Sequence, residues 1–150
     1  MALSPFEEIV GFALDKEKEA MLFYEDLAKQ VDDPVMKESL LSMANEEQKH
    51  ARLIRGLTPK DIILGPGPSE ADLKIGNYLV EVRPSRDLSY QELLIIAIKR
   101  EEKSLLLYSD LEKRAADAAT RNLFVLLKGE EMKHKTRLER EYEERILWNP

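Results

Sequence analysis

Four glutamates interrupt the apolar stripes of this chain, and they constrain its fold more than any other feature. In four segments apolar residues recur every three or four positions, the spacing that places them on one face of a helix. Each of these faces carries one glutamate near its middle: Glu17, Glu47, Glu101 or Glu131. An ionised carboxylate removed from water is strongly destabilising unless it is paired or bound to a cation. A helical bundle built from these segments therefore needs something that compensates four buried charges.

The two histidines of the chain suggest what that compensation is. His50 and His134 each follow a core glutamate by three residues, which places each imidazole on the same helix face as that glutamate. Two divalent cations would balance four carboxylates, and oxygen ligands with imidazole suit iron or manganese and accept zinc or cobalt. We therefore predict a site for two metal ions with six ligands: Glu17, Glu47, His50, Glu101, Glu131 and His134.

The two halves of the chain repeat each other at a shift of 84 residues. EKEAMLFY at 17–24 aligns with EEKSLLLY at 101–108, and EEQKH at 46–50 aligns with EEMKH at 130–134. A duplicated helical hairpin explains one shared shift more simply than coincidence does. The alignment also pairs Tyr24 with Tyr108, each two turns beyond a core glutamate. We expect their hydroxyls to hydrogen-bond to metal-bound carboxylates, with plain core packing or a redox-active phenol as the alternatives.

Capping residues mark where the helices begin. Ser4 with Glu7, and Ser89 with Glu92, have the spacing of a capping box, and aspartates precede the other two periodic segments. We predict helices over about 4–31, 34–57, 89–115 and 117–147.

A long crossover separates the two predicted hairpins. Segment 58–87 contains four prolines and three glycines, which exclude a long helix. A helix of about 25 residues is roughly 37 Å long, and some thirty irregular residues can span that length. The expected fold is all-α: one domain over 1–150, a ferritin-like four-helix bundle made of two helical hairpins joined by the crossover.

Composition limits the partners and the compartment. The net charge of −6 argues against nucleic-acid binding, and no apolar run has the length needed to cross a bilayer. The chain has no cysteine, which excludes disulfides and cysteine-ligated centres and fits a reducing cytoplasm. Its start has no basic n-region typical of a signal peptide. We expect a soluble, cytoplasmic protein with neither nucleic-acid nor membrane partners.

Some acids beside the predicted ligands are expected to face solvent. Glu46 and Glu130 immediately precede ligand glutamates, so they point about 100° away from them on a helical wheel. We predict both to be solvated, together with Glu19 and Glu102.

The four motifs resemble those of the rubrerythrin and ferritin-like di-iron carboxylate superfamily, and the resemblance covers all four helices. It implies two iron ions, with manganese or a mixed pair as alternatives, bridged by Glu47 and Glu131. Glu17 and Glu101 would then be terminal ligands, and each histidine would bind one ion. The resemblance also implies a peroxidase or oxidase that reduces peroxide or dioxygen, and a homodimer.

Departures from these families refine the expectation. Rubrerythrins carry a cysteine-ligated rubredoxin site, and this chain has no cysteine, so an external electron donor such as a rubredoxin-type protein is expected. Ser104 stands where rubrerythrin has an additional glutamate, and Gln48 stands where bacterioferritin has its haem-ligating methionine, so no haem is expected. The alternative functions are an iron-binding or storage ferritin-like protein and a non-catalytic metal-binding bundle.

Overall fold

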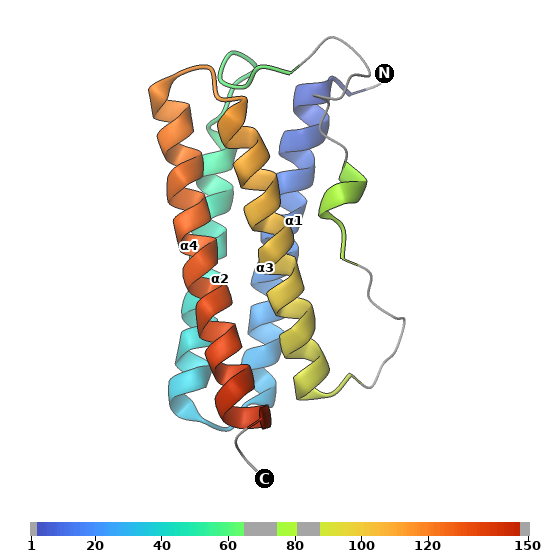
Figure 1. Ribbon diagram of the computed structural model, residues 1–150, viewed down its shortest axis with the longest axis vertical. Helices are drawn as coiled ribbons and strands as arrows, with labels where there is room; N and C mark the ends of the chain where they lie inside the picture. The colour runs from blue at the N-terminus through green and yellow to red at the C-terminus, as the bar shows by residue number, and fades with distance from the viewer. Residues whose placement is uncertain (1–2, 65–74, 81–87, 148–150) are drawn as a thin grey trace.

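Four long helices run side by side in the computed structural model, which describes residues 3–64, 75–80 and 88–147 (Figure 1). They are α1 (Pro5–Gln30), α2 (Pro34–Arg55), α3 (Tyr90–Lys113) and α4 (Ala118–Tyr142). A short 3₁₀-helix, η1 (Ile75–Tyr78), precedes α3, and a π-helical stretch, η2 (Glu143–Leu147), follows α4. The predicted all-α four-helix fold is confirmed. Within the described residues, no helix is long and apolar enough to cross a membrane.

The caps predicted from the sequence start all four long helices. The Ser4 and Ser89 hydroxyls each accept a hydrogen bond from the backbone N–H three residues on, and both capping boxes are complete. Asp33 and Asp117 accept backbone N–H bonds at 3.0 and 2.7 Å. The helix ends differ slightly from expectation. Helix α3 stops at Lys113 rather than near 115, and the α-helical part of α4 stops at Tyr142, where η2 takes over.

Short turns join α1 to α2 and α3 to α4, so each pair is a hairpin (Figure 1). Much of the predicted crossover, 65–74 and 81–87, lies outside the described residues. Its described centre contacts both hairpins. The Tyr78 hydroxyl donates to Asp110 Oδ2 on α3 at 2.7 Å, and Lys16 Nζ on α1 donates to the Tyr78 carbonyl at 3.2 Å. Element η1 is therefore fastened across α1 and α3.

The apolar core consists of two clusters separated by a polar layer. One cluster gathers the C-terminal part of α1 and the N-terminal part of α2 with residues of α3 and α4, including Leu40, Leu94 and Leu138. The other gathers the opposite ends of these helices, including Ile54, Leu107 and Phe124. In α1 and α2, Glu17 and Glu47 lie in the sequence between residues of the two clusters. The polar layer is thus enclosed by hydrocarbon at both ends.

Apolar periodicity predicts Phe6 and Val10 on the inner face of α1 and Leu105 on the inner face of α3, and the structure differs at these positions. In α1, Ile9 is buried, whereas Phe6 and Val10 are only half-buried. In α3, Ser104 and Leu107 are buried, whereas Leu105 is half-buried. A step of four residues advances 40° beyond a full turn and a step of three falls 60° short, so periodicity alone left the choice between Ser104 and Leu105 open.

We predict that truncating one core leucine of α2 destabilises the fold strongly. Leu40 is fully buried at 0% exposure, so Leu40→Ala should lower the free energy of unfolding by about 2–5 kcal/mol. Its neighbour Leu41 is 49% exposed, and Leu41→Ala should change that free energy by no more than about 0.5 kcal/mol. Urea unfolding of both variants, at one fixed metal content, checks this. Equal effects at the two positions would contradict the assigned helix face.

Candidate metal centre

The six predicted ligands meet in the polar layer at the centre of the bundle, and none is more than 4% exposed. Each long helix contributes one glutamate, and α2 and α4 add a histidine one turn later. The side chains form two groups whose donor atoms lie within 4.8 Å of one another: Glu17, Glu47, His50 and Glu131 in one, and Glu47, Glu101, Glu131 and His134 in the other. Glu47 and Glu131 belong to both groups, so their carboxylates could reach a metal ion in either one.

The closest contacts cross between the hairpins. His50 Nδ1 on α2 lies 2.8 Å from Glu131 Oε1 on α4. In the matching contact, His134 Nδ1 on α4 lies 2.8 Å from Glu47 Oε1 on α2. The shift of 84 residues converts one contact into the other. The sequence repeat therefore corresponds to an approximate two-fold relation within the site.

Unsatisfied polar atoms concentrate in this centre. Eight buried side-chain nitrogen and oxygen atoms of the described residues lack a hydrogen-bond partner, and seven of them belong to the six predicted ligands. Buried polar groups are nearly always satisfied, so a cluster of orphaned acceptors calls for an explanation. Both imidazole Nδ1 atoms and carboxylate oxygens from all four glutamates are among them. Such a set of hard oxygen and imidazole donors fits a pair of divalent cations.

Two tyrosines orient the terminal glutamates. The Tyr24 hydroxyl on α1 donates to Glu101 Oε1 on α3, and the Tyr108 hydroxyl on α3 donates to Glu17 Oε1 on α1. These bonds leave Glu17 Oε2 and Glu101 Oε2 without a partner, and hence available to a cation. Burial, with the nearby carboxylates, raises the pKa of both phenols well above the ordinary value, so they stay protonated donors. The hydrogen bonds expected for these tyrosines are present.

Without metal the centre binds protons. Burial raises the pKa of Glu47, Glu101 and Glu131 well above the usual range, and the charge of a neighbouring carboxylate adds to the effect. Burial also opposes a charge on His50, but the nearby carboxylates of Glu131, Glu17 and Glu47 outweigh this effect and raise its pKa to about 12. The pKa of Glu17 is lowered despite its burial, by hydrogen bonds to Glu47, His50 and Tyr108.

Glu46 is a site residue that the sequence prediction placed wrongly. It was expected to face solvent, but its Oε2 lies 2.5 Å from His134 Nε2, and its side chain is 35% exposed. A carboxylate on Nε2 favours the tautomer that leaves Nδ1 free for a metal. No sequence signal distinguishes Glu46 from Glu130, because both lie 100° from a core glutamate on their helices. The packing of α2 against α4 decides which of them meets a histidine. Glu130 was also predicted to be solvated, but it is half-buried, with its side chain 28% exposed, and it lies 3.5 Å from Lys133 on its own helix. Glu19 and Glu102 are exposed as predicted.

Fold and site together define a ferritin-like four-helix bundle with a buried carboxylate and histidine centre that could hold metal ions. The family model for Rubrerythrin matches residues 8–142, and the chain belongs to this family. Among solved structures, a hypothetical protein from Pyrococcus furiosus is 28% identical with a TM-score of 0.73, over 97% of this chain and 92% of that one.

A second solved structure has the same fold at lower sequence identity. This protein, from Thermotoga maritima, is provisionally described as a ferritin-like diiron-carboxylate protein. It is 24% identical with a TM-score of 0.71, over 93% of this chain and 95% of that one. No curated protein matches the chain.

We predict that the metal-free protein becomes less stable as the pH rises and that bound metal offsets this loss. Glu47, Glu101, Glu131 and His50 have raised pKa values in the folded state. The folded metal-free protein therefore holds more protons than the unfolded chain, and it should lose stability between about pH 5 and pH 8. The pKa of Glu17 is lowered instead, so this one group acts in the opposite direction to the other four.

Metal binding displaces those protons, so stabilisation by metal should grow over the same range. Melting temperatures of metal-free and Mn(II)-loaded protein at both pH values check this. A melting temperature of the metal-free protein that rises with pH would contradict it.

Proposed function

We propose that this protein is a rubrerythrin-like peroxidase or oxidase. In this proposal two iron ions, or a manganese or mixed pair, react with peroxide or dioxygen, and an external donor supplies electrons. One observation carries the proposal: two ligand groups overlap at Glu47 and Glu131 inside a buried layer rich in unsatisfied donor atoms. Membership of the rubrerythrin family supports the same class of chemistry.

The chain's own residues would hold the metals and protect them from water. A ferrous pair supplies two electrons, which with two protons reduce one hydrogen peroxide to two waters. Glu47 and Glu131 balance the charge between the two positions, and His50 and His134 each serve one of them. The two tyrosines hold one oxygen of each terminal glutamate, so the other oxygen keeps its orientation. The apolar clusters above and below exclude bulk solvent.

In our proposal the electron donor is a separate protein. The 150 residues contain no cysteine, so they cannot build the cysteine-ligated iron site that delivers electrons within other rubrerythrins. A separate rubredoxin-type protein would deliver them, and a homodimer in the cytoplasm would be the working form. Reduction of the oxidised protein by purified rubredoxin, followed by absorbance, and light scattering of the native protein test these two partners.

We predict that protein loaded anaerobically with Fe(II) binds two irons per chain and is oxidised by peroxide faster than free Fe(II). The sharpest variant is Glu101→Ala, since Glu101 is 1% exposed and belongs to one ligand group. Loss of a ligand should weaken the binding of at least one iron by about 100-fold or more. Removing a residue that only hydrogen-bonds to a ligand already weakens metal binding by up to about 100-fold. Its neighbour Glu102 is exposed and provides the matched control, so Glu102→Ala should leave two irons and the rate unchanged.

The outcomes separate the candidate functions. Oxidation no faster than free Fe(II), with two irons bound, would reject the enzyme in favour of a metal-binding bundle. Equal iron content in the Glu101→Ala and Glu102→Ala variants would reject the ligand assignment itself.

A further inference from the structure

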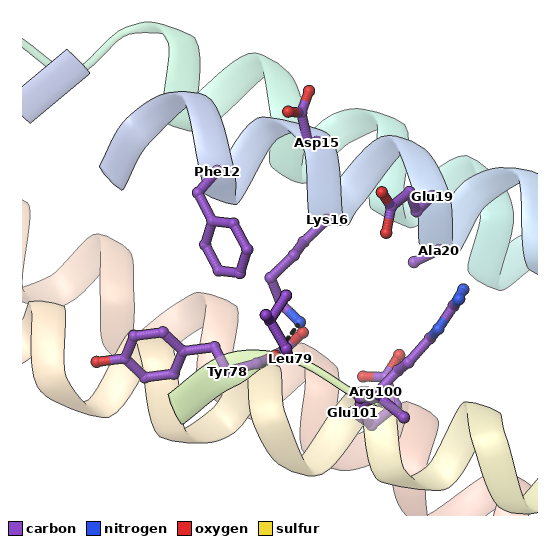
Figure 2. A pocket seen from close by; sticks show the side chains of 11 residues that line it. Phe12, Asp15, Lys16, Glu19, Ala20, Tyr78, Leu79, Arg100 and Glu101 are labelled. Atoms are coloured by element: carbon purple, nitrogen blue, oxygen red, sulfur yellow. Dashed lines mark hydrogen bonds between the residues drawn. The ribbon is translucent and has the colours of Figure 1, made fainter. Parts of the chain in front are cut away.

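A cavity of about 170 Å³ leads from solvent to the candidate metal centre between α1, α3 and η1 (Figure 2). Exposed residues border it, among them Asp15 and Glu19. Buried Ser104 and the predicted ligand Glu101 lie at its inner end. Glu101 Oε2 has no hydrogen-bond partner. The cavity therefore reaches from the surface to a predicted ligand that has one unsatisfied oxygen.

Both halves of the repeat build this cavity in the same way. The shift of 84 residues carries Lys16 onto Arg100 and Ala20 onto Ser104, and all four residues line the cavity. Each terminal glutamate is thus preceded by a cation and followed, one turn later, by a small residue. Ala20 and Ser104 leave space beside Glu101. Lys16 and Arg100 bring positive charge to walls that also carry the acids Asp15 and Glu19. Such a paired arrangement is not the gap left by one poorly packed side chain.

The two cations are held in place by aromatic rings and by η1. Lys16 extends from α1 toward Tyr78 and Leu79 (Figure 2), donates to the Tyr78 carbonyl at 3.2 Å, and lies 5.7 Å from the centre of the Phe12 ring. The Arg100 guanidinium lies 4.7 Å from the centre of the Phe23 ring. Contacts of this kind fix a cation without neutralising it. Both side chains therefore remain hydrogen-bond donors for a small polar or anionic molecule.

We infer that this cavity is the entrance by which a small oxidant reaches the metal centre, namely hydrogen peroxide or a compact hydroperoxide. The inference rests on the proposed function and specifies its substrate class. The volume sets the upper size, because an engineered cavity of about 150 Å³ accommodates benzene, which has six non-hydrogen atoms. Lys16 and Arg100 donate hydrogen bonds to the peroxide oxygens, and Ala20 and Ser104 keep the approach to Glu101 open.

A groove on the other side of the bundle provides a matched control. It lies between α2 and α4, has a volume of about 470 Å³, and reaches His134. Its walls carry the acids Glu38, Glu46 and Glu130 together with Lys133 and Arg137. The Glu46 carboxylate already contacts His134 Nε2. Glu46 already occupies the Nε2 side of this imidazole, so we expect no entry of azide from the groove. Ser42, which is exposed and lines this groove, allows the same serine-to-methionine change there.

The test is the rate at which azide binds to the iron-loaded, oxidised protein, followed by stopped-flow absorbance. Ser104→Met and, independently, Ala20→Met fill the cavity from α3 and from α1. Each should slow azide binding by about tenfold or more, because the longer side chain obstructs the route; tenfold in rate is about 1.4 kcal/mol of added barrier. Ser42→Met should leave the rate within about twofold of the wild type, since surface changes are usually small. Iron content must stay at two per chain in each variant used.

Either of two results would show that this cavity is not the route by which the oxidant enters. One is an unchanged azide rate in both cavity-filling variants, and the other is equal slowing in Ser42→Met. In the wild type, faster turnover of hydrogen peroxide than of the bulkier cumene hydroperoxide supports the size limit, and equal turnover overturns it. Azide binding needs no turnover, so wild-type protein that binds azide rapidly but does not consume peroxide would reject the proposed function alone.

Discussion

Mutual repulsion among four carboxylates in a dry interior is the constraint on which the rest of this structure depends. Burial and neighbouring charge raise the pKa of three of them, so the metal-free centre retains protons that the unfolded chain would release. Divalent cations would remove this penalty without a change of side chains. The surrounding architecture keeps the carboxylates together: hydrocarbon on both sides, and tyrosines that hold two of them. The same buried carboxylates therefore lower the stability of the metal-free fold and provide the ligands for metal ions.

The two repeated hairpins contact each other reciprocally at the candidate metal centre. Each tyrosine serves the glutamate of the other hairpin, and each histidine lies against the predicted bridging glutamate of the other hairpin. Neither hairpin alone holds a complete site. This reciprocity has one exception, since Glu46 contacts His134 whereas its repeat equivalent Glu130 lies near Lys133. The two metal positions are therefore equivalent in their predicted ligands and different in the groups around them.

Sequence reasoning succeeded where the determinants are local and failed where neighbouring helices decide. Helix caps depend on residues three apart, and the glutamates stood out because they interrupt apolar periodicity. The structure brings together all six predicted ligands. The choice between Ser104 and Leu105 as the buried residue depends on the exact rotation of α3 against α1, which periodicity does not define. The contact of Glu46 with His134 and the seat of η1 across α1 and α3 likewise depend on tertiary packing.

One wall of the cavity lies outside the helices that carry the predicted ligands. All six predicted ligands are on the long helices, whereas Tyr78, Leu79 and Val80, on one wall of the cavity, belong to the crossover. Connecting segments tolerate change far better than packed helices do. Selection could therefore reshape what is admitted to the centre by altering this one segment, while the machinery that holds the metals stays constant. Homologous bundles with the same ligands could diverge in substrate range by this route.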